Sequence, residues 1–186
     1  MKWRYFFLTI AAVISISLPN YAVSEECNEE TWNQALNYQK KVDRWYNSQA
    51  RQFNDFLKVH KQHVFLHQEF NARELETIWN PRKRNLQRKI DMQIKASEIV
   101  IVALDDQSDQ INEESEIVQS ALSRWQRISQ NCEKEHKIAN AISSLKYIKS
   151  NQNLKVELVQ LLDKIDRVKR IYQTEVDTLN WTKNVH

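Results

Sequence analysis

Glycine is absent from all 186 residues of the chain, and proline occurs only twice. An average chain of this length carries roughly 13 glycines. Phosphate-binding loops such as GxGxxG and GxxxxGK[ST], and the GxSxG nucleophile elbow, are therefore excluded, because each needs backbone conformations that glycine adopts at low cost. A glycine-free composition rich in Gln, Lys, Glu, Leu and Ile predicts an all-α fold and argues against the enzyme classes built on those loops.

The first residues have the features of an export signal. Lys2 and Arg4 precede an uncharged, largely apolar run from Phe6 to Leu18, which is followed by small residues that suit signal peptidase. The run is shorter than the roughly 20 apolar residues of a membrane-spanning helix. We expect residues 1–24 to be a signal peptide, residues 25–186 to be a single helical domain, and the protein to be periplasmic or secreted. Whether the leader is cleaved or retained as an anchor stays open.

The net charge gives no argument for nucleic-acid binding. The formal charge of +3 includes Lys2 and Arg4, so it falls to +1 once the leader is excluded. Nucleic-acid-binding domains usually carry a clustered surplus of Lys and Arg on one face. We therefore expect no nucleic-acid partner, and no motif in the chain indicates a cofactor.

The two cysteines and the second proline together indicate a helical hairpin. Cys27 and Cys132 follow the leader, and in an oxidising compartment they should form a disulfide. Their midpoint falls at Asn80–Pro81, where asparagine is a good N-cap and proline suits the first helical position. A helix over about 28–79, packed antiparallel to one that begins at about 81, would bring the cysteines together. The sequence thus predicts an elongated antiparallel hairpin closed by this disulfide.

Hydrophobic periodicity agrees with the hairpin and adds a third helix. Between Ile90 and Cys132, apolar and serine residues alternate at spacings of three and four, the pattern of a coiled-coil seam. A heptad stripe then predicts a helix over about 153–182, and the preceding KSNQN (149–153) is typical of a turn. We expect a three-helix, coiled-coil-like bundle. Whether the second helix, about 81–149, bends after Cys132 stays open.

The hairpin register makes two further predictions. The acidic run Asp105–Glu116 should face the basic residues Lys40, Lys41, Arg44 and Arg51. Folding the third helix back about KSNQN should form one aromatic layer at the disulfide end, from Trp32, Trp125 and Trp181.

Three of the five histidines, His60, His63 and His67, lie within eight residues. On a helix, residues four apart share a face, a spacing at which some metalloenzymes present two ligands, and the register places Glu98 nearby. Three interpretations stay open. These residues form a metal site, they form a pH-responsive layer because histidine titrates near neutrality, or they fill a polar layer of the seam. No metal ligand is firm, and no catalytic residue is assigned.

The basic segment around Pro81 is the candidate partner-binding site. Its members are Trp79, Arg82, Lys83, Arg84, Arg88 and Lys89. Basic residues in a first helical turn are unfavourable against the helix dipole, so their presence indicates a contact rather than helix stabilisation. An aromatic and basic tip would engage an anionic partner, such as lipid headgroups, a phosphorylated glycan or an acidic protein face.

These features predict a non-enzymatic interaction or scaffolding protein that binds a protein or an anionic envelope component through its hairpin tip and helix faces. One alternative is a periplasmic chaperone, or a sensor of stress, metal or pH. Another is an unrecognised enzyme, although the missing glycine-built sites argue against it. Peripheral membrane contact and homo-oligomerisation also stay open.

Overall fold

The computed structural model describes residues 26–79 and 83–184. Within these ranges the chain is helical and contains no β-strand, so the all-α prediction is confirmed. The elements are α1 (Glu29–His60), α2 (Leu66–Glu69), α3 (Ala72–Glu76), the 3-10 helix η1 (Thr77–Trp79), α4 (Arg84–Glu114), α5 (Glu116–Lys134) and α6 (Ile138–Asn184). The leader, Asn80–Pro81 and Arg82 lie outside the described residues.

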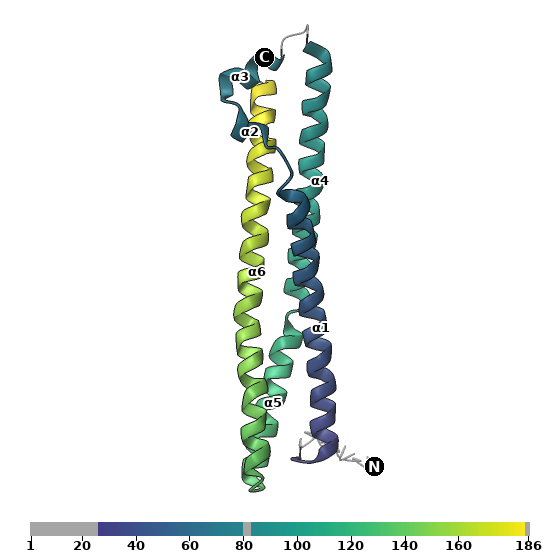
Figure 1. Ribbon diagram of the computed structural model, residues 1–186, viewed down its shortest axis with the longest axis vertical. Coiled ribbons are helices and arrows are strands. Elements are labelled where there is room, and N and C mark those ends of the chain that lie inside the picture. Colours follow the sequence, from purple (N-terminus) through teal and green to yellow (C-terminus); the bar gives the residue numbers. More distant parts are fainter. Residues whose placement is uncertain (1–25, 80–82, 185–186) are drawn as a thin grey trace, which may run out of the picture.

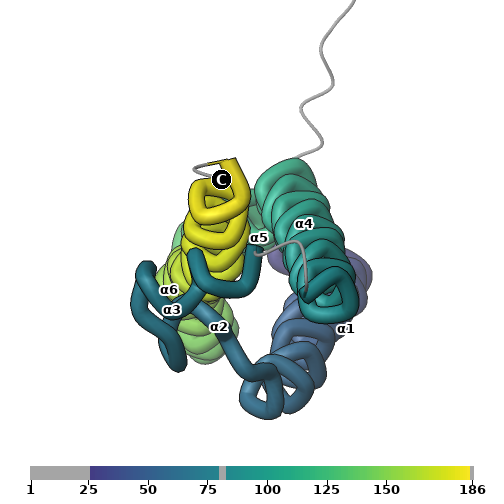
Figure 2. Tube along the Cα trace, turned by 90° about the horizontal axis from the view of Figure 1, so that it is seen from above, coloured from purple at the N-terminus to yellow at the C-terminus, as the bar shows by residue number. Residues whose placement is uncertain are grey.

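The molecule is an elongated helical bundle (Figure 1). α1 runs from the disulfide end toward the other end, α4 and α5 return along the bundle, and α6 spans its whole length. We call the end formed by α2, α3, η1 and the start of α4 the tip. Seen from above the tip, α4, α6 and α1 surround a common axis, and α2 and α3 lie beside α6 (Figure 2).

The central core contains residues from each of the long helices. Its buried members are Val42, Phe53, Leu104, Ile111, Val118, Ala121, Leu154, Leu158, Leu161 and Ile165. α1 begins cleanly because the side chain of Asn28 accepts a hydrogen bond from the N–H of Thr31 (2.8 Å), and Glu29 and Glu30 in its first turn favour the helix dipole.

The first helix ends at His60, not near Trp79 as the sequence indicated. The chain leaves the helix because the N–H groups of Leu66 and His67 donate to the carboxylate of Glu175 on α6, both at 2.9 Å. Asn71 then starts α3 with a reciprocal capping box. A distant partner on α6 therefore sets this boundary.

The chain reverses after α5, at residues 135–137, and not at KSNQN. His136 adopts a positive φ of 58°, and the N–H of Lys137 donates to the carbonyl of Cys132 at 2.8 Å, which closes the helix end. KSNQN stays helical because Asn151 is fully buried and its side chain donates to Gln39 on α1 at 2.7 Å. The expected helices of about 81–149 and 153–182 are thus replaced by α4, α5 and α6.

This reversal changes the expected aromatic layer. The rings of Trp32 and Trp125 do meet edge-to-face, with centroids 5.1 Å apart. The third ring is Tyr147, which stacks on Trp125 at 4.1 Å. Trp181 instead lies at the tip and is 52% exposed, because α6 carries it to the far end of the bundle.

The acidic run on α4 lies against the expected part of α1 but does not pair with its basic residues. Glu114 accepts a hydrogen bond from the indole of Trp45, and the side chain of Gln107 donates to the carbonyl of Gln49 at 3.2 Å. Asp105 forms an ion pair with Lys169 of α6 at 2.6 Å. In the described part of the chain, no ion pair joins this run to the four basic residues of α1.

Candidate functional site

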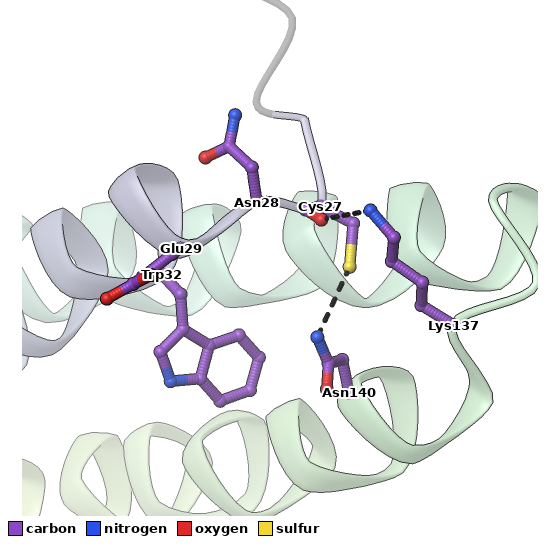
Figure 3. Close-up of a pocket in the computed structure, with 6 residues that line it drawn as sticks. All are labelled: Cys27, Asn28, Glu29, Trp32, Lys137 and Asn140. Atoms are coloured by element: carbon purple, nitrogen blue, oxygen red, sulfur yellow. Dashed lines mark hydrogen bonds between the residues drawn. The ribbon is translucent and has the colours of Figure 1, made fainter.

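The disulfide end is closed by its own side chains. Cys27 and Cys132 form the predicted disulfide, and both are buried, with exposed fractions of 4% and 0%. A cavity of about 410 Å³ lies beside Cys27 (Figure 3). Lys137 and the backbone of Cys27 are already engaged, since Lys137 Nζ donates to the Cys27 carbonyl (2.7 Å) and the Cys27 N–H donates to Glu135 (3.0 Å). This arrangement fits a structural lock rather than a binding site.

The tip presents the basic residues that the sequence indicated. Lys83, Arg84, Arg88 and Lys89 are all exposed. The start of α4 adds positive potential, because its N-cap residue provides no side-chain acceptor and its first turn contains no acidic residue. The described cationic side chains and the helix dipole therefore have the same sign at this end.

Trp79, also predicted for partner contact, is half-buried and serves as an anchor. Its indole N–H donates to the hydroxyl of Thr182 at 3.1 Å, and Lys183 Nζ lies 5.6 Å from its ring centroid. These contacts attach η1 to the last turn of α6. Trp181, next to Thr182, is the more exposed tryptophan at this end.

An apolar groove lies beside the basic residues. It has a volume of about 300 Å³, and it is lined by Leu66, Phe70, Glu74, Thr77, Ile78, Leu86 and Ile90. Phe70 and Leu86 are 45% and 40% exposed, so the groove presents two large apolar side chains to solvent. Sequence reasoning missed this groove because its walls come from α2, α3, η1 and α4, whose arrangement depends on the break after α1.

Beneath the groove, the three clustered histidines surround Glu175 of α6. Glu175 is fully buried, and its Oε2 lies 2.6 Å from His67 Nδ1. Gln93 of α4 donates to Glu175 Oε1 at 3.0 Å and lies 3.1 Å from His63 Nε2. His60 Nδ1 lies 3.3 Å from the Tyr172 hydroxyl. The chain after α1 is thus bonded to α4 and α6 through one carboxylate.

Burial and hydrogen bonding act on this cluster in opposite directions. Burial alone would raise the pKa of Glu175. The backbone N–H groups of His67 and Leu66 and the side chains of Gln93 and His67 stabilise its carboxylate, and together they lower the pKa by more than burial raises it, so the net shift is downward. Burial, with a smaller contribution from the charge of His63, lowers the pKa of His60. Burial also raises the pKa of the Tyr172 hydroxyl.

The carboxylate beside the histidines is Glu175, not Glu98. Glu98 lines an exposed stretch of α4 with Lys95, Ile99 and Val102. Among the residues that the structure describes, no group of three or more His, Cys, Asp or Glu side chains is arranged to hold a metal ion.

The described helices include none that combines the length and the apolar character needed to cross a membrane. Comparison with known proteins finds no matching family model, no matching curated protein and no matching solved structure. The functional argument therefore depends on the tip itself.

Proposed function

We propose that this protein is a non-enzymatic interaction protein of an exported compartment, and that its tip binds an anionic envelope surface. The observation that supports this proposal is the combination of exposed basic side chains at the start of α4 with the partly exposed apolar groove beside them. A purely ionic partner would need no groove, and a purely apolar one would gain nothing from the cations. The two together favour a ligand that is both anionic and apolar, such as a membrane rich in anionic lipid.

The shape of the molecule is consistent with an end-on contact. The tip is one end of an elongated bundle (Figure 1), and the exposed rings of Phe70, which follows α2, and of Trp181, near the end of α6, both belong to it. Aromatic side chains with basic neighbours are common at membrane–water interfaces. The groove also has an acidic wall residue, Glu74, whose carboxylate accepts from the N–H of Asn71 at 2.8 Å. The basic side of the contact is therefore α4.

Export is supported by two features. The leader has a basic start and an apolar run, and the Cys27–Cys132 disulfide is of a kind that persists in oxidising compartments.

Charge reversal at the tip tests this proposal. We expect Lys83→Glu, Arg84→Glu and Lys89→Glu, combined, to abolish sedimentation with phosphatidylglycerol vesicles at low salt, while the wild type binds them and ignores phosphatidylcholine vesicles. The matched control reverses Lys40, Lys41 and Arg44, three exposed cations on α1 that lie away from the tip. Added salt should weaken wild-type binding, because exposed charges are screened beyond about 8–10 Å at physiological ionic strength. Equal binding by both triple variants would refute the tip contact.

A second candidate function is that of a pH sensor, and the histidine cluster near Glu175 (His60, His63 and His67) favours it. Protonation of side chains at this junction would alter the contacts that hold the chain after α1 against α6. The expected pH dependence is argued in the Discussion.

A further inference from the structure

The outer face of α6 presents a regular stripe of aliphatic side chains. Five of them are each more than half exposed: Ile138 (52%), Ile142 (59%), Leu145 (52%), Val156 (57%) and Val159 (67%). With Lys149 and Gln152, which are also exposed, they alternate at spacings of four and three residues, the spacing of a coiled-coil seam. The opposite face of the same helix contributes to the core. Each turn of the stripe is therefore available to a second helix.

We propose that this stripe is a dimer interface, at which α6 of one copy packs antiparallel against α6 of a second copy. The central part of the stripe has the same pattern from either end, because Ile142 and Leu145 lie on one side of a polar centre formed by Lys149 and Gln152, and Val156 and Val159 lie on the other. A two-fold interface needs a self-complementary surface of this kind, since each residue meets the residue at the mirrored position of the other copy. An axis between residues 150 and 151 meets that condition.

In this register the four central aliphatic residues face one another, whereas Ile138 at the end of the stripe faces the exposed Asp163 of the second copy. Leu145 faces Val156 of the second copy, Ile142 faces Val159 of the second copy, and Lys149 faces Gln152 of the second copy. Each layer occurs twice, once on either side of the axis. The two lysine–glutamine layers beside the axis cost some stability, but polar layers in a seam specify register and oligomeric state.

A second exposed stripe lies on α4, and its sequence explains why we place the dimer interface on α6. Its apolar residues are Met92, Ile99 and Val102, which are 65%, 70% and 59% exposed, and it continues with the exposed acidic residues Asp106 and Glu113. If this stripe packed antiparallel against its own copy along its full length, Met92 would face Glu113 and Ile99 would face Asp106. The α4 stripe therefore lacks the self-complementarity that the α6 stripe has.

The first test compares one acidic substitution on each stripe. We expect the full mature chain to show a concentration-dependent monomer–dimer equilibrium in sedimentation equilibrium. Leu145→Glu should weaken the dimer by about tenfold or more, because it places a carboxylate in an apolar layer, whereas Ile99→Glu on α4 should leave it unchanged. Circular dichroism should show equal helix content for all three proteins, since both residues are exposed. A monomer at every concentration, or an equal loss with Ile99→Glu, would overturn the proposal.

The second test addresses the antiparallel register. Lys149→Leu should tighten the dimer, because it replaces the polar layer with an apolar one. Oxidation of a mixture of Leu145→Cys and Val156→Cys chains should give a crosslink between the two variants, since the native cysteines already form the disulfide. Crosslinks only between identical chains, or a dimer weakened by Lys149→Leu, would rule out this arrangement.

Discussion

At the scale of single residues, His136 shows the cost of a chain without glycine. It is the only described non-glycine residue with a positive φ, at 58°, and it occupies the position after a helix end where glycine is usual. The left-handed conformation costs a residue with a Cβ roughly 1–2 kcal/mol. The turn is held by the disulfide beside it and by the bond from Lys137 N–H to the Cys132 carbonyl.

We therefore predict that His136→Gly stabilises the protein. The gain in the free energy of unfolding should be about 1 kcal/mol, since relief of the left-handed strain is partly offset by the greater freedom of glycine in the unfolded chain. Urea denaturation monitored by circular dichroism measures the change. His136→Ala is the control and should give little gain, because alanine retains the Cβ. If the two variants have the same stability, the turn is unstrained.

At the scale of elements, the break after α1 is the feature that sequence reasoning could not find. No glycine or proline separates His60 from Trp79, and the local signal in this interval is the Asn71–Glu74 capping box, which marks the start of α3 and not the end of α1. The chain breaks there because Glu175, more than a hundred residues away, accepts the N–H groups of Leu66 and His67. Local propensity is only a weak prior against such tertiary contacts. The start of α1 was predictable, because its cap at Asn28 is local.

This junction makes stability depend on pH. Because the pKa of His60 is lowered in the folded protein, the unfolded chain binds the proton more readily. The free energy of unfolding should then fall as the pH decreases through the unfolded value of about 6.5. Glu175 adds a second fall at lower pH, because its depressed pKa gives stability above its ordinary value of 4.5 that is lost as it becomes protonated.

The measurement is urea denaturation at several pH values between 7.5 and 5, for the wild type and for His60→Phe. Phenylalanine keeps an aromatic ring next to Phe56, with which His60 stacks at 6.0 Å, but cannot titrate. We expect a flatter pH profile for His60→Phe than for the wild type. Identical profiles for His60→Phe and the wild type would show that His60 does not contribute to the pH dependence.

At the scale of the whole molecule, the disulfide joins two residues that are 105 positions apart, at the end opposite the tip. The pairing was predictable because only two cysteines follow the leader and their midpoint coincides with a helix breaker.

The position of the third helix was not predictable from the sequence. KSNQN has the composition of a turn, and only the buried bonds of Asn151 with Gln39 and the Tyr147 carbonyl show why it is helical. The groove was unpredictable for the same reason, since it needs the correct helix ends.

Removing the disulfide should lower stability substantially. For a closed loop of this length, the double variant Cys27→Ser and Cys132→Ser should lose about 4–5 kcal/mol of unfolding free energy, chiefly because the unfolded chain gains freedom. Urea denaturation of the oxidised wild type and of the variant gives this difference directly. Unchanged circular dichroism at low urea confirms that both begin folded. A loss below about 1 kcal/mol would mean that the helices alone hold the disulfide end together.

The uninterrupted length of α6 gives the proposed dimer the geometry of a spacer. From residue 150 to its end at Asn184, α6 extends roughly 50 Å at about 1.5 Å per residue. Two copies that cross antiparallel at this point would hold their tips roughly 100 Å apart, facing in opposite directions. Such a pair could not place both tips on one flat surface, so dimerisation would not increase avidity for a single membrane. It would connect two surfaces that face each other, across a gap set by the helix.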